Sequence, residues 1–268
     1  MQKESRRKKT ILITGASSGI GLATAEAFAA RASLANPVEL LLLARRQERL
    51  ADLQAKWKEQ PGLETHAIAL DVRDFSAVES FAAKYSEIIS RLDILVNNAG
   101  LAAGRDPIQT GDPADWNAMI DTNVKGLLYM TRIVAPHLIA KKSGHIVNIG
   151  SVAGHFVYPQ GAVYCATKYG VRAINEGLRM DLLGTGVRVS SIDPGMVETE
   201  FSLVRFKGKK ELAKAVYDGT TPLAPEDIAE AILWVTSLPA HVNVQDMVIM
   251  PTDQASVGHV YRRNARAP

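Results

Sequence analysis

At Thr14-Gly15-Ala16-Ser17-Ser18-Gly19-Ile20-Gly21 the chain turns from a short apolar run into an Ala-rich helical segment, and this stretch decides the fold. Glycine at positions 15, 19 and 21 allows a tight turn, brings bare backbone N–H groups to a pyrophosphate, and lets the helix pack closely on the strand. The spacing differs from Gly-x-Gly-x-x-Gly, and the Gly-Lys-Ser/Thr ending of a P-loop is missing. Its position between the first strand and the first helix nevertheless favours a dinucleotide-binding turn over an ordinary loop.

Short apolar runs alternate with segments of helical spacing along the rest of the chain. The runs, which we interpret as buried strands, are Thr10–Thr14, Glu39–Ala44, Thr65–Leu70, Ile94–Val96, His145–Ile149, Val187–Ile192 and Met247–Met250. The helical segments between them are Ile20–Arg31, Glu48–Lys58, Phe75–Ser90, Ala114–Ala140, Ala162–Leu183 and Pro225–Thr236. Continuously apolar strands joined through helices indicate parallel strands that are covered on both faces. We therefore predict an α/β fold, a single-domain Rossmann-type doubly wound sheet of about seven parallel strands with helices on both faces.

The domain organisation follows from the same pattern. The sequence contains no internal repeat and no Gly/Ser-rich or Pro-rich linker, so one domain is favoured over two. We expect a basic N-terminal arm over residues 1–9, one folded domain over residues 10–255, and a tail over residues 256–268. Residues 101–113 and 196–222 break the alternation after candidate strands. Ligands bind beyond the carboxyl ends of parallel strands, so both stretches are candidate site walls, and residues 196–222 are the candidate substrate lid.

Composition excludes several classes of protein. The 268 residues are 47% hydrophobic and 22% charged, as in a soluble globular protein. The formal net charge of +3 is concentrated at the two ends, which argues against a nucleic-acid partner. No apolar run approaches the roughly 20 residues that span a bilayer, so no membrane association is expected. The lone Cys165 makes a cytoplasmic location the default, and no cluster has metal-ligand spacing, so no metal is expected.

The end of the second predicted strand indicates which dinucleotide binds. An NAD site offers an Asp or Glu there to the ribose 2′-hydroxyl, whereas this chain has Ala44-Arg45-Arg46. The small alanine leaves room for a 2′-phosphate, and two guanidinium groups can make bidentate hydrogen bonds to it. NADP is therefore favoured over NAD. The alternative is that both arginines are a solvated helix start. Asp71, at the end of the third strand, is placed to accept a hydrogen bond from the adenine amino group.

A second group of residues points to proton transfer. Ser151 follows a predicted strand, and Tyr164 and Lys168 lie four residues apart on a predicted helix, where they share one face. A phenol has a pKa of about 10, and a nearby ammonium stabilises the phenolate, so we expect Lys168 to lower the pKa of Tyr164. Tyr164 would then act as general acid and base, while Ser151 holds the substrate oxygen. Taken singly, each of these residues has an ordinary structural explanation.

Together these residues resemble the short-chain dehydrogenase/reductase family over nearly the whole chain. The matching positions are Thr14-Gly15-xxx-Gly19-x-Gly21, Asp71, Asn97-Asn98-Ala99-Gly100, Asn123, Ser151, Tyr164-xxx-Lys168 and Pro194-Gly195. The resemblance implies that Lys168 also binds the nicotinamide ribose and that Asn123 anchors a water that relays protons from Lys168. It also implies that Asn98 and Gly100 contact the adenosine ribose, and that the nicotinamide is lined by Pro194, Gly195, Val197 and Thr199.

The candidate sets are then as follows. The candidate catalytic residues are Ser151, Tyr164, Lys168 and Asn123. The candidate cofactor-binding residues are Gly15, Ser17, Ser18, Gly19, Ile20, Gly21, Arg45, Arg46, Asp71, Val72, Asn98, Ala99, Gly100, Lys125, Tyr164, Lys168, Pro194, Gly195, Val197 and Thr199. For Lys125 a solvated helix lysine is the simpler explanation.

A finer resemblance concerns the substrate. Residues 42–46, 121–124, 164–166, 197–208 and 220–223 resemble the NADP-dependent 3-hydroxy acid dehydrogenase subgroup, which includes serine dehydrogenases. The subgroup implies L-serine, L-allo-threonine or 3-hydroxypropionate-type substrates, or their semialdehydes. An acid substrate needs a cation, and a guanidinium on the lid offers a bidentate site, so the candidate substrate residues are Ser151, Tyr164 and Arg205. A solvated basic face is the alternative for Arg205.

Two other functions are compatible with the same residues. One is an NADPH-dependent carbonyl reductase of neutral ketones or aldehydes, and the other is a non-catalytic NADP-binding regulator. A regulator of this kind usually lacks the Tyr or the Lys of the active pair, whereas this chain keeps both. The family resemblance also implies a homotetramer whose main interface pairs the helices that carry Asn123 and Tyr164.

Overall fold

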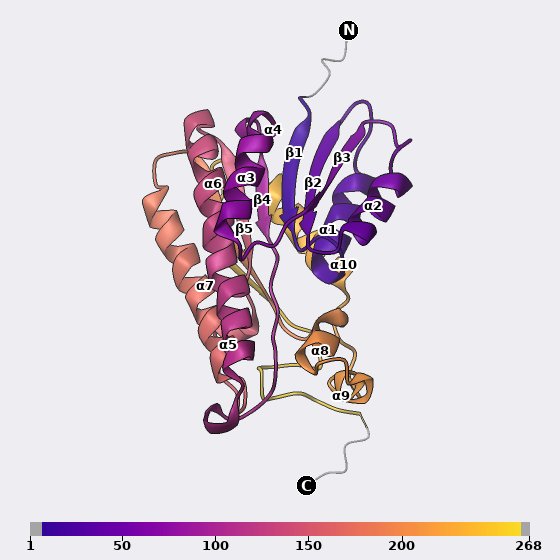
Figure 1. Ribbon diagram of the computed structural model, residues 1–268, viewed down its shortest axis with the longest axis vertical. Helices are drawn as coiled ribbons and strands as arrows, with labels where there is room; N and C mark the ends of the chain where they lie inside the picture. The colour runs from indigo at the N-terminus through magenta and orange to yellow at the C-terminus, as the bar shows by residue number, and fades with distance from the viewer. Residues whose placement is uncertain (1–6, 264–268) are drawn as a thin grey trace.

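Seven parallel strands form one sheet in the computed structural model, which describes residues 7–263 (Figure 1). The strands lie in the order β3-β2-β1-β4-β5-β6-β7. Their bounds are β1 Lys9–Thr14, β2 Val38–Ala44, β3 Leu63–Ala69, β4 Ile94–Asn97, β5 Gly144–Ile149, β6 Val187–Pro194 and β7 Asp246–Ile249. The strand order reverses direction between β1 and β4, as expected for a doubly wound sheet. The predicted single α/β domain is confirmed.

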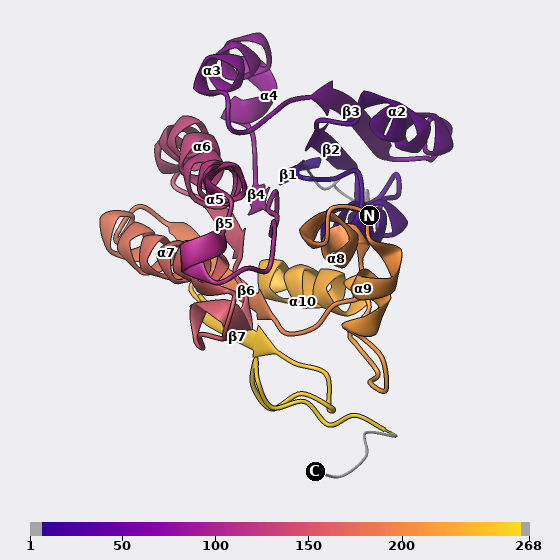
Figure 2. The ribbon, with the colours of Figure 1, turned by 60° about the horizontal axis from the view of Figure 1, so that its bottom comes forward.

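Helices cover both faces of the sheet (Figure 2). One face carries α1 (Gly19–Ala30), α2 (Gln47–Lys56) and α10 (Pro225–Ser237). The other carries α3 (Phe75–Lys84), α4 (Ser86–Ser90), α6 (Leu127–Lys141) and α7 (Ala162–Asp181). The short helix α5 (Pro113–Ile120) precedes α6 on this second face.

The buried strands supply a core on each face. Ile11 and Ile13 pack with α1 and α10, whereas Leu12 between them packs with α3, α4 and α6. Neighbouring side chains on a strand point to opposite faces, so a strand covered on both sides is apolar at every position. The burial of every residue of β2 follows the same rule, and this explains why the central strands are continuous apolar runs in the sequence.

Three predicted segments differ in detail from the structure. The predicted helix over 75–90 is divided at Tyr85 into α3 and α4. The predicted helix over 114–140 is interrupted by a π-helical segment, η2 (Asp121–Gly126). The lid region contains two helices that the pattern did not predict, α8 (Glu200–Arg205) and α9 (Lys210–Ala215). Each of these two is six residues long, too short for a helical period to stand out.

The ends of the chain are only partly described. Most of the predicted basic arm, residues 1–6, and the end of the tail, residues 264–268, lie outside the described residues. Two short 3₁₀ segments, η1 (Ile108–Thr110) and η3 (Val152–Gly154), complete the list of elements. Among residues 7–263 no helix is both long and apolar enough to cross a membrane.

Candidate active site

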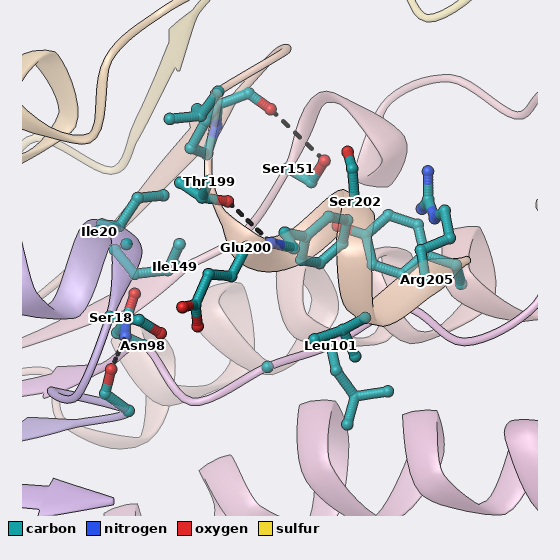
Figure 3. Close-up of a pocket in the computed structure, with 18 of the residues that line it drawn as sticks. Ser18, Ile20, Asn98, Leu101, Ile149, Ser151, Thr199, Glu200, Ser202 and Arg205 are labelled. Carbon is teal, nitrogen blue, oxygen red and sulfur yellow. Dashed lines mark hydrogen bonds between the residues drawn. The ribbon is translucent and has the colours of Figure 1, made fainter. Parts of the chain in front are cut away.

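A cleft of about 670 Å³ lies beyond the carboxyl ends of the strands (Figure 3). The loops that follow β1, β2, β4, β5 and β6 all contribute to its wall, and α8 lies across it. The cleft thus occupies the position that parallel sheets offer to ligands. It has two ends, one beside the glycine turn and one beside Tyr164 and Arg205.

The glycine turn is shaped to receive a ligand against bare backbone. Gly15 has a φ of +68°, and a Cβ there would meet the Asn98 amide at 2.9 Å and the Ala99 backbone at 3.0 Å. A Cβ on Gly21 would lie 2.4 Å from both Asn98 Nδ2 and the Gly15 carbonyl oxygen. Only glycine fits both positions, so the turn can bring its N–H groups against a phosphate group.

Two side chains fix the turn to the neighbouring strand. The Thr14 hydroxyl accepts hydrogen bonds from the backbone N–H groups of Asn98 and Ala99, at 3.0 and 2.9 Å. The Asn98 amide donates to the carbonyl oxygens of Thr14 and Gly15, at 2.8 and 3.2 Å. Asn98 therefore connects β4 to the glycine turn from within the cleft wall. Thr14 was not among the candidate residues, although its place at the head of the glycine motif could have identified it.

The two arginines after β2 have different surroundings. Arg46 donates to the hydroxyls of Ser17 and Ser18 and pairs with the carboxylate of Glu200 at 2.8 Å. Arg45 is exposed at the cleft and makes no hydrogen bond or ion pair within residues 7–263, although it attracts the Asp71 carboxylate at longer range. The guanidinium of Arg45 is therefore the group best placed to meet an added phosphate.

Asp71 and Val72 lie in the cleft wall beyond β3. The Asp71 carboxylate accepts from Arg73 Nε at 2.9 Å and from Arg73 Nη2 at 2.6 Å. These hydrogen bonds lower the pKa of Asp71, against the opposing effect of its partial burial. Asp71 is thus an ionised hydrogen-bond acceptor at the cleft, but Arg73 already donates to its carboxylate oxygens.

The structure brings Ser151, Tyr164 and Lys168 together at the other end of the cleft. The Ser151 hydroxyl caps η3 by accepting from Ala153 N at 3.1 Å, and it donates to Pro194 O at 3.4 Å. The ammonium of Lys168 donates to the Ile149 carbonyl at 2.8 Å and lies 6.0 Å from the centre of the Tyr164 ring. A hydroxyl, a phenol and a buried ammonium thus lie within one small space.

The pKa of Tyr164 shifts in the direction opposite to the one we expected. Burial raises the pKa of Tyr164 to about 12, and the Arg205 guanidinium only partly opposes this effect. Burial also lowers the pKa of Lys168 to about 8, with the Asp193 carboxylate partly offsetting it. The expected lowering of the Tyr164 pKa by Lys168 is therefore wrong for the protein as described, because desolvation outweighs a cation 6.0 Å from the ring.

Asn123 lies in η2, behind the cleft wall rather than in it. Its amide oxygen accepts from Leu101 N at 2.8 Å, and its amide nitrogen donates to Leu101 O at 2.8 Å and to Thr167 Oγ1 at 3.0 Å. A Cβ on Gly100 would lie 3.3 Å from Asn123 Oδ1 and 3.8 Å from Lys168 Nζ. Asn123 and Lys168 therefore approach the same glycine from two helical segments.

Arg205, at the end of α8, reaches the same space as Tyr164. Its guanidinium lies 4.9 Å from the Tyr164 ring centre and 5.1 Å from that of Phe201, and it donates to the Tyr158 hydroxyl at 2.9 Å. No carboxylate in residues 7–263 pairs with it. Arg205 is thus a cation held by aromatic side chains with donors left for an anion, and it is not part of a solvated basic face.

Most of the remaining candidates line the cleft, and two, Gly21 and Lys125, do not. The lining includes Gly15, Ser17, Ser18, Gly19, Ile20, Ala99, Gly100, Pro194, Gly195, Val197 and Thr199. Gly21 supports the turn from behind, as described above. Lys125 is exposed and pairs with Asp121 at 2.8 Å, so the structure does not bring it to the cleft and the simpler explanation holds.

Several cleft residues were not predicted. Phe201 packs its ring against Tyr164 at 5.7 Å between centres, and Gln254 accepts from Met196 N at 2.8 Å. The predicted tail also takes part, since Val257, Val260 and Arg262 line the cleft. Phe201 belongs to the predicted lid, but no signal in the sequence singled it out. The tail residues come from a segment without a motif, and only the fold brings them to the site.

Comparison with known proteins shows what this geometry is similar to. Residues 9–210 match the short chain dehydrogenase family. An NADP-dependent 3-hydroxy acid dehydrogenase of Salmonella typhi is 46% identical over 249 residues, which cover 92% of this chain and 97% of the relative. Sulfoacetaldehyde reductase 2 of Chromohalobacter salexigens is 48% identical over 246 residues, covering 91% and 95%. The closed form of a serine dehydrogenase complexed with NADP⁺ superposes with a TM-score of 0.86 at 44% identity, covering 95% of this chain and 100% of that one.

Proposed function

Because this chain belongs to the short-chain dehydrogenase family, we propose that it is an NADP-dependent oxidoreductase of small 3-hydroxy acids or their semialdehydes. The reaction transfers hydride between the nicotinamide and the carbon that carries the hydroxyl group. L-Serine, L-allo-threonine and 3-hydroxypropionate are the substrate types we propose.

The cleft residues fit NADP. The glycine turn would receive the pyrophosphate, and Arg45 would bind the 2′-phosphate, with Ser18 and its partner Arg46 also in the cleft wall. Asp71 and Val72 would border the adenine, and Pro194, Gly195, Val197 and Thr199 the nicotinamide. When bound, NADP supplies the hydride acceptor or, reduced, the hydride donor. The residues of the chain then have to bind the substrate and handle one proton.

Tyr164 is the proposed general acid and base for that proton. Ser151 holds the substrate oxygen, and the buried Tyr164 phenol exchanges the hydroxyl proton with it. Since burial raises the pKa of Tyr164 to about 12, the phenolate needs positive charge, which Lys168 and Arg205 supply at 6.0 and 4.9 Å from the ring centre. Asn123 is the proposed anchor of the proton path from Lys168, because it borders the same glycine.

The observation that carries the choice of an acid substrate is the guanidinium of Arg205. It lies 4.9 Å from the Tyr164 ring centre, at a distance where a small substrate could contact both groups. The relatives are named for a hydroxy acid, serine and sulfoacetaldehyde, and each of these compounds carries an anionic group. A neutral ketone would leave the Arg205 charge without a partner in the closed site, which favours the acid over the carbonyl reductase alternative.

Replacing Arg205 tests the proposal. We expect Arg205→Ala to lower kcat/KM for L-serine by about 100-fold, because a charged hydrogen-bonding pair contributes about 3 kcal/mol. The control is a neutral primary alcohol assayed with the same variant, which should lose far less. An unchanged kcat/KM for L-serine would contradict the assignment of Arg205. If the variant turned over the neutral alcohol better than any acid and the wild type did the same, the enzyme would be a carbonyl reductase.

We also propose a homotetramer that pairs the helices bearing Asn123 and Tyr164. Large apolar side chains stay exposed on these helices in the single chain, among them Leu128 and Ile139 on α6 and Tyr169 and Met180 on α7. Gel filtration with light scattering tests this, and a monomer would contradict it. A cytoplasmic location completes the proposal and is supported by the buried free thiol of Cys165, which a reducing compartment preserves.

A further inference from the structure

The ion pairs of the lid helix α8 lie at its first residue, at the end away from Arg205. Glu200, its first residue, pairs with Arg46 Nη1 and with Arg49 Nη1, each at 2.8 Å. Both arginines belong to the start of α2, across the cleft from the lid. All three side chains are about 40% to 46% exposed, so water reaches the pairs but does not separate them.

Arg46 continues this connection into the glycine turn. Its Nη2 donates to Ser18 Oγ at 2.7 Å and to Ser17 Oγ at 3.1 Å, while its Nη1 holds Glu200. Beside this pair, the Thr199 methyl group lies 3.2 Å from the position of a Cβ on Gly19. The start of α8 is therefore attached to the cofactor end of the cleft by a continuous chain of polar contacts and by direct packing.

The other end of the same helix carries the substrate residue. Figure 3 shows the Glu200 carboxylate directed toward Ser18, with Arg205 at the opposite end of α8. Between them Phe201 packs edge-on against the Tyr164 ring. Glu200 and Arg205 are five residues apart, about one and a half turns of the same short helix, so a shift of the first residue moves the guanidinium relative to Tyr164.

We propose that Glu200 is a positioning residue that holds α8 closed over the cleft through Arg46 and Arg49, and so places Arg205 for an acid substrate. This inference rests on the proposed function for the role of Arg205, but the closure itself does not. Glu200 then connects the two ends of the site, because the arginine that binds it also binds the glycine turn. Three cations, Arg45, Arg46 and Arg49, stand at this end, and Glu200 balances one of them.

Trypsin gives a readout that needs neither cofactor nor substrate. The lid offers cleavage sites at Arg205, Lys207, Lys209, Lys210 and Lys214. When opening is fast, cleavage follows the population of the open lid, and a partly exposed ion pair shifts that population about fivefold. We expect Glu200→Gln to accelerate cleavage within residues 196–222 about fivefold, as mapped by mass spectrometry of the fragments. Arg49→Gln, which removes one of the two pairs, should accelerate it less.

The matched control is Glu198→Gln, which neutralises an exposed acid two residues away that lines no part of the cleft. This variant should be cleaved like the wild type, and thermal unfolding should show that all variants are folded. Raising the salt concentration should reduce the difference between wild type and Glu200→Gln. Equal lid cleavage in Glu200→Gln and wild type would overturn the proposal.

Kinetics then tests the connection to Arg205. Glu200→Gln should raise KM for L-serine about fivefold and change kcat much less, since the reacting groups are intact. Accelerated cleavage with an unchanged KM would overturn the link to Arg205. If the wild type oxidised no acid while Glu200→Gln still accelerated cleavage, the proposed function would fail and the closure by Glu200 would stand. If the wild type oxidised the acids but Glu200→Gln did not accelerate cleavage, the proposed function would stand and the role of Glu200 would be refuted.

Discussion

At the scale of single residues, the site is organised by two buried groups whose charged forms are both disfavoured. Burial raises the pKa of the Tyr164 phenol to about 12 and lowers that of the Lys168 ammonium to about 8. The two pKa values move apart from their ordinary 10.0 and 10.5, so both groups favour their uncharged forms, and moving a proton from the phenol to the amine costs more free energy than it would in water. The aromatic setting of Arg205 adds a fixed charge beside the phenol, so substrate recognition and proton transfer use the same space.

Removal of the Tyr164 hydroxyl tests its role directly. We expect Tyr164→Phe to lower kcat by about 10³-fold, because the substrate loses its general acid and base while the ring still packs against Phe201. Steady-state rates with L-serine and NADP measure this. NADPH binding, followed by the fluorescence of the reduced nicotinamide, is the control and should change little. A variant that retained a tenth or more of the wild-type kcat would show that another group handles the proton.

At the scale of the elements, the glycine turn depends on one close approach between β1, β4 and the start of α1. The Asn98 amide fills the space next to Gly15 and Gly21, so the turn, the strand end and the helix must keep their spacing together. The same interdependence makes the turn a rigid support for a phosphate group.

A single methyl group added to Gly21, where α1 comes close to Gly15 and Asn98, should disturb the glycine turn. A Cβ at position 21 would lie 2.4 Å from backbone and amide atoms, so Gly21→Ala must shift the helix from the strand. We expect a loss of at least about tenfold in NADPH affinity, measured by fluorescence titration, together with a lower Tm. Gly258→Ala is the control, since its Cβ would meet nothing within 4 Å. Unchanged NADPH binding in Gly21→Ala would place the cofactor elsewhere.

The elements also show where sequence reasoning succeeds. Strands such as β2 are apolar at every position because both faces are covered, so the pattern alone located them. The π-helical segment η2 has no such signature, since its residues continue the helical spacing on both sides. The helices α8 and α9 escaped prediction because six residues are less than two helical turns.

In the candidate site, too, some residues could be predicted from the sequence and others could not. Gly15, Tyr164 and Lys168 could be named because their chemistry requires a fixed spacing along the chain. Glu200 and Phe201 could not, because their roles depend on where the lid lies against distant helices. The pKa of Tyr164 was predicted in the wrong direction because a sequence gives the nearest charge but not the extent of desolvation.

At the scale of the whole molecule, the sheet contains a buried acid far from the cleft. Glu39 on β2 is fully buried and accepts from Arg91 at 2.8 Å and from Thr10 at 3.1 Å, while His66 lies at 3.1 Å. The exposed Glu64 lies beside His66, and these two with Glu39 could in geometry hold a metal ion. The Arg91 guanidinium already neutralises Glu39, so we interpret the cluster as structural.

This cluster predicts how the protein responds to acid. Burial opposes ionisation of Glu39, but the hydrogen bonds from His66 and Arg91 outweigh it and lower its pKa to about 2, below the ordinary 4.5. A depressed carboxyl pKa contributes stability above the unfolded value and loses it as the pH falls toward the folded value. Wild type should therefore lose stability between pH 4.5 and 2 in part through this group.

Glu39→Gln isolates the contribution. The variant should be destabilised by about 3 kcal/mol at neutral pH, because Arg91 loses its buried partner. Its stability should fall less steeply than that of wild type in the acid range. Urea unfolding at a series of pH values measures both effects. Parallel pH profiles for the two proteins would contradict the assigned role of Glu39.

The proposed function depends on what the purified protein oxidises. The most direct measurement is a panel of L-serine, L-allo-threonine, 3-hydroxypropionate and matched neutral alcohols, each with NADP and with NAD, read by the absorbance of the reduced nicotinamide. We expect the hydroxy acids to reduce NADP, the neutral alcohols to react much more slowly, and NAD to be a poor substitute. Turnover of neutral alcohols in preference to every acid, or equal use of NAD, would contradict the proposed function.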